Sequence, residues 1–383
     1  MKIAFVSTYP PTQCGIATYS VPLVEGIDAT EPGSVMVIGD VDAEESNDKI
    51  KVEATFKRRN NLANPILEAV DRNRPDIVHI QYTPDILGTG AQIYGLLKGL
   101  RERGIKSVLT MHTVYTLYSG ILERKPHTMY FNNRLGKLSD AIVVHQPSII
   151  NMLKHHGVPT EKVHMIPHWT STELKGDGTG LREKLDIPQD APLLLFFGFI
   201  HVQKNVHTVI KAMPNILKEI PEAKLVIAGS IAGGTWYNNL YGSYIRRLIK
   251  SNCLEDSVKL LAGFVPQEEV ADYYSAADIV LMPHSQKYGS ASGVAHQALA
   301  ARRLMLCSDS AKFEEIGLNV SPELLVPATR HKLWAKEAVR LLKKRGENGE
   351  FLDKICNYAD ETSVERVVEK HMALYKSLVA KAD

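Results

Sequence analysis

Side chains that could bind a sugar or an anion follow directly after several short apolar runs of the sequence. His112 ends the run KSVLTMH, and Tyr115 and Tyr118 come just after it. An imidazole at such a position can hydrogen-bond a sugar hydroxyl, and tyrosine rings can stack on a sugar face. Lys204 follows the run PLLLFFG at the start of an expected helix, where an ammonium group and free backbone N–H groups suit a diphosphate. A structural histidine and an ordinary surface lysine are the plain alternatives.

Small residues mark two further places where a ligand could approach the backbone. Gly15 stands at the mouth of an expected helix within STYPPTQCGIATYS. Gly289, Ser290, Ser292 and Gly293 lead straight into the apolar helix GVAHQALAA. Helix N-termini favour anions because their first N–H groups have no partner in the helix. The alternatives are a tight strand–helix turn at Gly15 and an ordinary serine N-cap at Ser290 or Ser292.

The sequence lacks the motifs that are typical of several other enzyme classes. There is no GxGxxG, GxxxxGK[ST], GxSxG or HExxH string. This argues against a nicotinamide-dependent oxidoreductase, a P-loop NTPase, a serine hydrolase and a zinc protease. The histidines show no metal-ligand spacing, so we expect neither a metal nor a cofactor. The cysteines, which lie far apart, are expected to be reduced thiols of a cytoplasmic protein; they are Cys14, Cys253, Cys307 and Cys356.

Length, composition and charge indicate the class of protein that carries these residues. A chain of 383 residues predicts at least two domains, because one core rarely grows past ~250–300 residues. Its 44% hydrophobic and 23% charged residues are globular values. A net charge of +2 argues against a nucleic-acid partner. The longest apolar stretch, Leu193–Ile200, is shorter than the ~20 residues that cross a bilayer, and the start MKIAFVSTYPP lacks the pattern of a signal peptide.

One local run of basic residues breaks the even charge balance, and it extends from Lys49 through Lys51, Lys57 and Arg58 to Arg59. Such a run is usually a solvated face. The alternative is contact with anionic lipid or an acidic substrate, which would place the protein at the cytoplasmic face of a membrane.

Short strands and helices alternate along both halves of the chain, which predicts parallel sheets with helices on both faces. We therefore expect two doubly wound α/β halves, joined by a Gly-rich linker at 171–191 with a hinge near Gly176–Gly180. Ligands of such sheets bind beyond the carboxyl ends of the strands, which is where the candidate residues lie. The expected strands are 2–7, 34–39, 76–82, 106–112, 141–145, 162–167, 192–198, 223–229, 257–263, 278–283 and 303–308.

The order and spacing of these strings resemble the retaining glycosyltransferases of family 4, from Met1 to about Tyr375. The resemblance implies the GT-B fold, with two Rossmann-like doubly wound parallel-sheet domains facing each other across a cleft. Residues 1–172 would form the acceptor-side domain, residues 173–365 would bind the nucleotide sugar, and a helix within 366–383 would cross back. The strings that carry it are PPTQCGIATYS, TMH, FGFIHVQKN, LVIAGS, VKLLAGFVPQEEVADYYSAADIVLMP and SGVAHQALAA.

The resemblance also implies roles for individual residues. His112 and Lys204 are the expected catalytic residues: His112 contacts the donor sugar and Lys204 holds the diphosphate. The expected donor-binding residues are Gly15, Gly198, His201, Lys204, Gly229, Ser230, Gly263, Phe264, Val265, Gly289, Ser290, Ser292, Gly293, Val294 and Gln297. The expected acceptor-binding residues are Gln13, Cys14, Gly15, Tyr82 and Tyr115.

Three positions depart from the pattern of that family. Gly289 and Gln297 stand where two glutamates are common, and Phe199 stands where an arginine usually accompanies the diphosphate lysine. The first glutamate normally holds hydroxyls of the donor sugar, so its absence obscures which sugar is bound. Gln297 can still hydrogen-bond ribose hydroxyls, and His201 could take over part of the role of the arginine.

We therefore expect a metal-independent hexosyltransferase of carbohydrate biosynthesis. It would move mannose or glucose from a GDP- or UDP-type sugar to a hydroxyl of a carbohydrate, glycolipid or small-molecule acceptor, with retention of the anomeric configuration. One alternative is a nucleotide-sugar epimerase or hydrolase of the same fold. Another is a non-catalytic scaffold that binds a nucleotide or a sugar, which would suit the losses at Phe199, Gly289 and Gln297.

Overall fold

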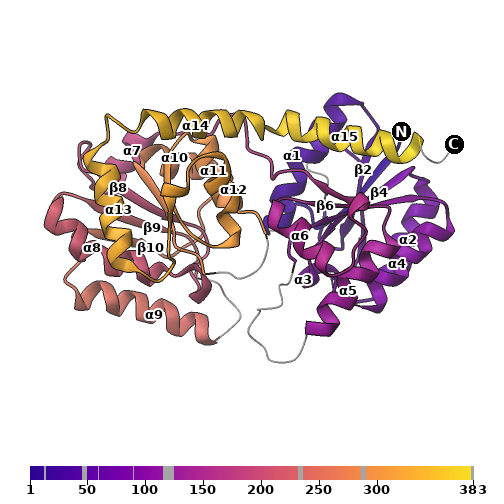
Figure 1. The fold of residues 1–383 in the computed structure, drawn as a ribbon, viewed down its shortest axis with the longest axis horizontal. Helices are drawn as coiled ribbons and strands as arrows, with labels where there is room; N and C mark the ends of the chain where they lie inside the picture. The colour runs from indigo at the N-terminus through magenta and orange to yellow at the C-terminus, as the bar shows by residue number, and fades with distance from the viewer. Residues whose placement is uncertain are drawn as a thin grey trace. The chain divides into compact units, whose positions relative to one another are not determined.

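The computed structural model describes residues 1–12, 14–44, 50–58, 60–88, 90–114, 125–231, 236–285 and 290–380 (Figure 1). The chain divides into two compact units. Unit 1 consists of Met1–Trp169, Tyr288–Gly293 and Val364–Asp383, and unit 2 consists of Thr170–Lys287 and Val294–Ser363. The boundaries drawn from the sequence, after residues 172 and 365, lie close to the divisions after Trp169 and Ser363.

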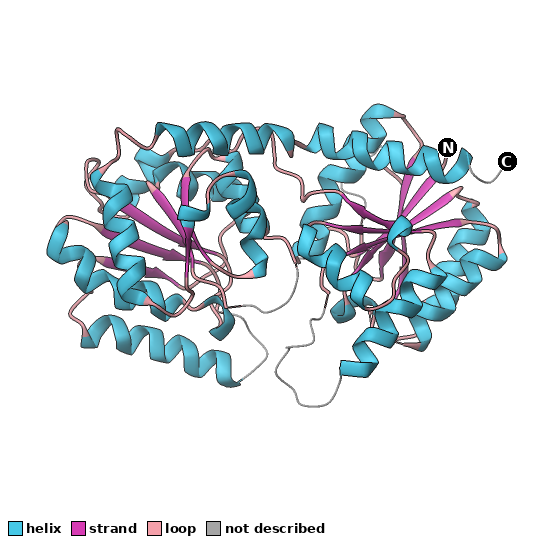
Figure 2. Ribbon diagram, in the orientation of Figure 1, coloured by secondary structure: helices cyan, strands magenta, loops and turns pink. Residues whose placement is uncertain are grey.

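Unit 1 is built on a parallel sheet of seven strands among its described residues (Figure 2). Across the sheet the strands follow the order β3-β2-β1-β4-β5-β6-β7. β1, β2, β4 and β6 are buried at every residue, because helices cover both faces of the sheet. The bounds are Ile3–Ser7 for β1, Val35–Asp40 for β2, Val52–Phe56 for β3, Ile77–Tyr82 for β4, Lys106–Met111 for β5, Ala141–Val144 for β6 and Val163–Met165 for β7.

Two sets of helices cover the two faces of this sheet. α1 (Gly15–Thr30) and α15 (Val364–Ala380) share one apolar cluster with Phe5 of β1. α2, α4, α5 and α6 share the other cluster with Val6, because successive residues of a strand point to opposite faces. The remaining bounds are Ala63–Asn73 for α2, Pro84–Leu87 for α3, Ala91–Glu102 for α4, Lys125–Leu138 for α5, Pro147–His155 for α6 and Thr160–Lys162 for the 3₁₀ helix η1.

Unit 2 has a parallel sheet of six strands among its described residues, in the order β10-β9-β8-β11-β12-β13. The strand bounds are Leu193–Phe197 for β8, Lys224–Ala228 for β9, Val258–Leu261 for β10, Ile279–Met282 for β11, Leu304–Ser308 for β12 and Leu325–Val326 for β13. The α-helices are α7 (Gly178–Lys184), α8 (Val206–Glu219), α9 (Trp236–Ser251), α10 (Val270–Ala276), α11 (Gly293–Ala300), α12 (Glu314–Asn319), α13 (His331–Lys343) and α14 (Gly349–Glu361). The 3₁₀ helices are η2 (Val202–Lys204), η3 (Gln267–Glu269), η4 (Ala311–Phe313) and η5 (Pro322–Leu324).

The predicted class of two doubly wound parallel α/β halves is confirmed, and every strand expected from the sequence is present. Two further strands were not expected. β3 reads VEATF and is only partly buried, so it lacks a continuous apolar run. β13 has two residues, too few to show any periodicity.

The expected linker and hinge are wrong, because the Gly176–Gly180 segment packs tightly on α10 of the same unit. The backbone N–H groups of Gly176 and Asp177 donate to Ser275 Oγ at 2.9 Å and Asp272 Oδ1 at 2.6 Å. A Cβ atom added at Gly176 would lie 2.4 Å from the α10 backbone. The glycines therefore allow this segment to pack closely against α10. The low apolar content of residues 171–191 was wrongly taken to indicate a flexible linker.

The C-terminal helix α15 is tied to unit 1 by buried polar contacts. The hydroxyl of Tyr375 lies 2.5 Å from His79 Nδ1, and His371 Nδ1 donates to the carbonyl oxygen of Val367 at 2.8 Å. Lys376 Nζ lies 3.1 Å from Oε1 of Glu31, the residue that follows α1. Burial lowers the pKa of His371 to about 4, so its ring is neutral near pH 7.

We expect acid to loosen unit 1 through His371. The ring is neutral when folded and has an ordinary pKa of 6.5 when unfolded, so its contribution to stability is complete above pH 6.5. That contribution falls by up to about 3 kcal/mol as the pH drops from 6.5 to 4. Guanidinium unfolding at several pH values checks this. His371→Leu should show a shallower pH dependence than the wild type and than the surface variant His155→Leu; identical slopes would contradict it.

Candidate functional site

Each sheet has one point where the strand order reverses, between β1 and β4 in unit 1 and between β8 and β11 in unit 2. Crossover helices leave in opposite directions at such a point, so the loops beyond the carboxyl ends separate and open a crevice. Cys14 and Gly15 follow β1, and Lys204 follows β8. The residues selected from the sequence therefore flank the reversal point of each sheet.

In unit 1 the start of α1 is open to a ligand. Cys14 is the N-cap of α1, and its Sγ accepts the N–H of Ala17 at 3.4 Å. The Cys14 Sγ also lies 3.0 Å from Thr8 Oγ1. Apart from its chain neighbours and its own helix backbone, no atom of the described residues lies within 4 Å of a Cβ added at Gly15, so this side of the backbone is open. Gln13, Tyr115, Tyr118 and Gly289 lie outside the described residues.

His112 is held by a chain of hydrogen bonds that ends at α15. His112 Nε2 lies 2.7 Å from Gln81 Oε1, and Gln81 Nε2 lies 3.3 Å from His79 Nε2. Since an amide oxygen only accepts, His112 Nε2–H donates to Gln81, which leaves Nδ1 of His112 as an acceptor. His79 Nδ1–H then donates to Tyr375. Burial, followed by the neighbouring His145, holds the pKa of His112 well below its ordinary value, so its ring is neutral.

Three histidine rings lie around the ring of Tyr19 of α1 at the carboxyl end of this sheet. Its ring centroid lies 4.6 Å from that of His112, 5.0 Å from that of His168 and 5.5 Å from that of His145. Burial raises the pKa of Tyr19 above its ordinary range. The sequence reasoning missed Tyr19, His145 and His168 as site residues. A signal existed for His145, which directly follows a strand, as His112 does.

Tyr82, an expected acceptor residue, is fully buried, and its hydroxyl donates to the carbonyl oxygen of Gly88 at 2.9 Å. Its side chain is therefore engaged within unit 1. Gln297, an expected donor residue on α11, is also engaged, since its Oε1 accepts the hydroxyl of Tyr274 at 2.9 Å. Its amide nitrogen is the group that can still hydrogen-bond a ribose hydroxyl. Contact of Tyr82 or Gln297 with a substrate stays a prediction.

Two glycines bring the first two loops of unit 2 together. Gly198 has φ +106° and Gly229 has φ +142°, both in the region that side chains rarely adopt. A Cβ on Gly229 would lie 2.2 Å from the carbonyl oxygen of Gly198. Ile200 N–H then donates to Ser230 O at 2.8 Å, which joins the two loops. A Cβ on Gly198 would lie 3.5 Å from Val294 of α11, so this helix also borders the crevice.

The remaining expected donor residues fall in two segments of the chain, the loop after β10 and the segment that leads into α11. Gly263 and Phe264 are exposed after β10, whereas Val265 packs on the core of unit 2. Ser290, Ser292 and Gly293 group with unit 1, and Val294 groups with unit 2. Contact of any of them with a nucleotide stays a prediction.

Lys204 lies at the end of η2, directly before α8. Burial lowers its pKa to about 7, and the nearby charge of Lys312 contributes. No carboxylate of the described residues lies within 4 Å of it. The expected free N–H groups of α8 are partly in use, because His207 N–H donates to the hydroxyl of Tyr241 at 3.3 Å and Thr208 N–H donates to Asn205 O at 2.8 Å. The positive charge at this point therefore comes mainly from side chains.

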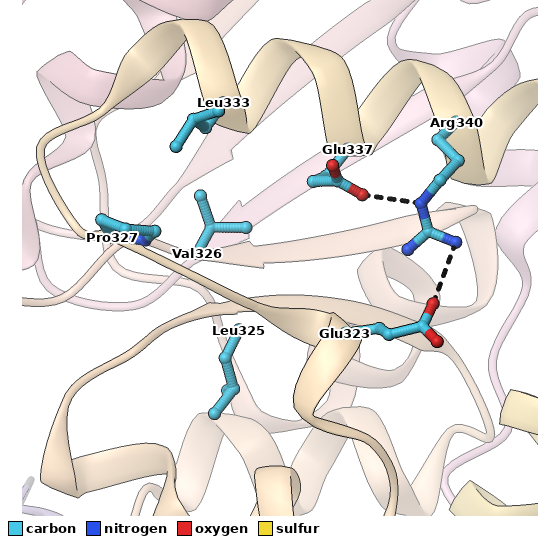
Figure 3. Close-up of a pocket in the computed structure, with 7 residues that line it drawn as sticks. All are labelled: Glu323, Leu325, Val326, Pro327, Leu333, Glu337 and Arg340. Atoms are coloured by element: carbon cyan, nitrogen blue, oxygen red, sulfur yellow. Dashed lines mark hydrogen bonds and ion pairs between the residues drawn. The ribbon is translucent and has the colours of Figure 1, made fainter.

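A cavity of about 280 Å³ opens beside β13, away from these residues (Figure 3). Arg340 of α13 pairs there with Glu337 at 2.6 Å and with Glu323 at 3.6 Å, as Figure 3 shows. The cation of this cavity is thus already paired with two carboxylates, and no residue selected from the sequence lines the cavity. The lining residues are Glu323, Leu325, Val326, Pro327, Leu333, Glu337 and Arg340.

The described residues lack both a metal-binding cluster and a membrane-spanning helix. No set of three or more His, Cys, Asp or Glu side chains there is placed to hold a metal ion. No described helix combines the length and the apolar character that a membrane crossing requires.

Comparison with known proteins agrees with this arrangement. The model of the "Glycosyl transferases group 1" family matches residues 179–362, and that of "Glycosyltransferase Family 4" matches residues 43–174. D-inositol 3-phosphate glycosyltransferase of Streptosporangium roseum is 26% identical over 56% of this chain and 50% of its own length. Alpha-monoglucosyldiacylglycerol synthase of Streptococcus pneumoniae is 29% identical over 52% of this chain and 47% of its own length. The chain thus spans about half the length of these curated relatives.

Solved structures share the whole fold at low sequence identity. Sucrose-phosphate synthase from Thermosynechococcus elongatus has a TM-score of 0.79 at 20% identity and covers 100% of both chains. Anabaena HepE, in complex with UDP, has a TM-score of 0.78 at 14% identity and covers 98% of this chain and 100% of its own. The two family models show that the chain belongs to glycosyltransferase family 4. The solved structures show that it has the GT-B fold.

We expect Gly229→Ala to destabilise unit 2, because its Cβ would meet the carbonyl oxygen of Gly198 at a φ that alanine rarely adopts. The expected loss is at least about 2 kcal/mol. Thermal or guanidinium unfolding measures it. Gly349→Ala is the matched control, since nothing lies within 4 Å of its added Cβ. Equal stability of the two variants would contradict the role given to Gly229.

Proposed function

We propose that this chain transfers a hexose, mannose or glucose, from a nucleoside-diphosphate sugar to a hydroxyl of a carbohydrate, glycolipid or small-molecule acceptor, with retention of the anomeric configuration. The observation that carries the proposal is Lys204, a half-buried cation at the reversal point of the unit 2 sheet with no carboxylate partner among the described residues. Membership of glycosyltransferase family 4 supports the same chemistry. We propose as well that the reaction needs no metal and that it takes place in the cytoplasm.

Lys204 acts on the leaving group. As the anomeric bond breaks, negative charge gathers on the departing diphosphate, and an ammonium group already in place stabilises that charge. The stabilisation is larger at a half-buried lysine than in water because the local dielectric constant is lower. Gly198 has no side chain, so the diphosphate can approach its backbone closely, and Gly229 holds the Gly198 carbonyl group in place by its own close contact.

His112 acts on the sugar. The sugar gains oxocarbenium character in the transition state, and a cation beside it would be repelled. His112 avoids this because its ring is neutral, with Nδ1 as an acceptor for a sugar hydroxyl. The hydrogen bond to Gln81 holds that tautomer, so His79 and Tyr375 position the ring indirectly.

The basic run of unit 1 supports a solvated face more than a lipid contact. Arg58 Nε donates to Asp40 Oδ2 at 2.6 Å, and Lys51 Nζ donates to Asn73 Oδ1 at 2.7 Å. Both cations are thus engaged within unit 1. Lys49 and Arg59 lie outside the described residues.

We expect Lys204→Met to reduce transfer about 10²-fold or more, because one donor to the transition-state charge is lost. The assay follows release of nucleoside diphosphate from UDP-glucose and GDP-mannose, with and without an acceptor. Lys211→Met, an exposed position on α8, is the matched control and should keep wild-type turnover. Near-normal turnover of Lys204→Met would refute the role of the lysine. If the wild-type rate of nucleoside diphosphate release is the same with and without an acceptor, the protein is a hydrolase or an epimerase.

We expect His112→Ala to reduce transfer while leaving the affinity for the free nucleoside diphosphate nearly unchanged, because the ring contacts the sugar only. Titration calorimetry with UDP and GDP measures that affinity. His155→Ala, on the surface of unit 1, serves as the control. A large loss of nucleotide binding in His112→Ala would show that the histidine has a different position in the site.

A further inference from the structure

Hydrogen bonds join the loops that follow β8, β11 and β12 of unit 2. Ser285 donates from its backbone N–H to Gln203 O at 2.8 Å, so the loop after β11 meets η2. Ser308 Oγ donates to His284 O at 2.6 Å, so the end of β12 meets the same loop. Lys204 of η2 and Lys312 of η4 are thereby brought to the two sides of one loop, although they are far apart in the sequence.

His284 lies at the centre of this group. Its ring is fully buried, 5.2 Å from the ring of Phe313 and 6.5 Å from that of Phe196. Among the described residues, neither of its ring nitrogens has a hydrogen-bond partner. Burial, and then the charges of Lys204, Lys312 and His201, hold its pKa well below the ordinary value. A buried imidazole that no described residue pairs with is costly, so a hydrogen-bonding ligand beside it would be stabilised.

Charge is also unbalanced around His284. Lys312 is only 8% exposed. Burial lowers the pKa of Lys312 to about 8 although Glu315 opposes the shift, and Lys312 in turn lowers the pKa of Lys204. Glu315 is buried as well, accepts the hydroxyl of Tyr358 at 2.9 Å, and can compensate one ammonium group. Lys204 has no carboxylate within 4 Å among the described residues, so its ammonium group favours a bound anion there.

Phe199 and His201, the positions considered for the missing arginine, do not provide a second cation. The phenyl ring of Phe199 is 55% exposed and carries no donor. The pKa of His201 is lowered to about 4 by burial and by the two lysines, so its ring is neutral near pH 7. Lys312 is then the nearby residue of this group that can carry a second positive charge.

We infer that Lys312 is the second cation of the diphosphate site: Lys204 and Lys312, on the loops after β8 and β12, bind the phosphates of a nucleoside diphosphate beside His284. This inference rests on the proposed function, because it assigns a further binding residue to the same site. A purely structural ion pair between Lys312 and Glu315 is the alternative that the experiment has to separate.

Inorganic pyrophosphate is the probe, because it lacks a base and so does not depend on which nucleotide is bound. Titration calorimetry should show that Lys312→Met weakens pyrophosphate binding about tenfold or more, as loss of a charge-assisted hydrogen bond does. Lys312→Arg should keep binding within about threefold, since the charge and the donors remain. Lys336→Met, an exposed position on α13, should bind as the wild type does.

Comparison with Lys204→Met distinguishes a failure of this inference from a failure of the proposed function. If Lys204→Met loses pyrophosphate while Lys312→Met keeps wild-type affinity and only melts earlier, Lys312 is structural and the inference is overturned. If the wild type binds neither pyrophosphate, UDP nor GDP, the proposed function itself fails.

A measurement on the unaltered protein covers the case in which Lys312→Met does not fold. A bound diphosphate keeps both lysines protonated, whereas the free protein has partly lost their protons at pH 8.5. Calorimetry of UDP or GDP binding in buffers of different ionisation enthalpy should then show uptake of more than about one proton. Uptake of one proton or fewer at pH 8.5 would contradict binding by two lysines.

Discussion

The reversal of strand order in each parallel sheet is the constraint on which the rest of this molecule depends. All strands of a parallel sheet end at the same edge, and at one point the crossover helices part and leave loops without a covering element. In unit 1 this point lies beside Gly15, and in unit 2 it lies beside Gly198 and Lys204. The side chains that bind and react can therefore come from distant parts of the chain and still meet at a single edge.

The protein concentrates its charge where the reaction needs it. The whole chain carries a net charge of only +2, yet Lys204 and Lys312 lie close enough to lower the pKa of Lys204. The histidines of unit 1 show the opposite use of burial, because His79 and His112 are held neutral and serve as hydrogen-bonding groups. Burial thus goes with a concentration of positive charge in unit 2 and with uncharged histidines in unit 1, as the proposed transfer requires.

Sequence reasoning succeeded where local patterns carry the information. Continuous apolar runs revealed the buried strands, and His112 and Lys204 stood out because each comes at or just beyond a strand end. It failed at Gly176, where low apolar content suggested a free linker but the glycine allows contact with α10. It also passed over Lys312, since a lysine four residues beyond a strand looks like any surface lysine until its burial is known.

By itself, the sequence determined the class of fold, the family and the loops that hold the candidate site residues, because periodicity and strand-end motifs are local properties of the chain. Only the tertiary structure decided which titratable side chains are charged and which side chains contact one another. Protonation states depend on burial and on neighbours from other elements, as at His201 and His371. The pairing of Lys204 with Lys312 and the link from Tyr375 to His112 arise from packing alone, since those residues are separated along the chain and joined only when the sheets form.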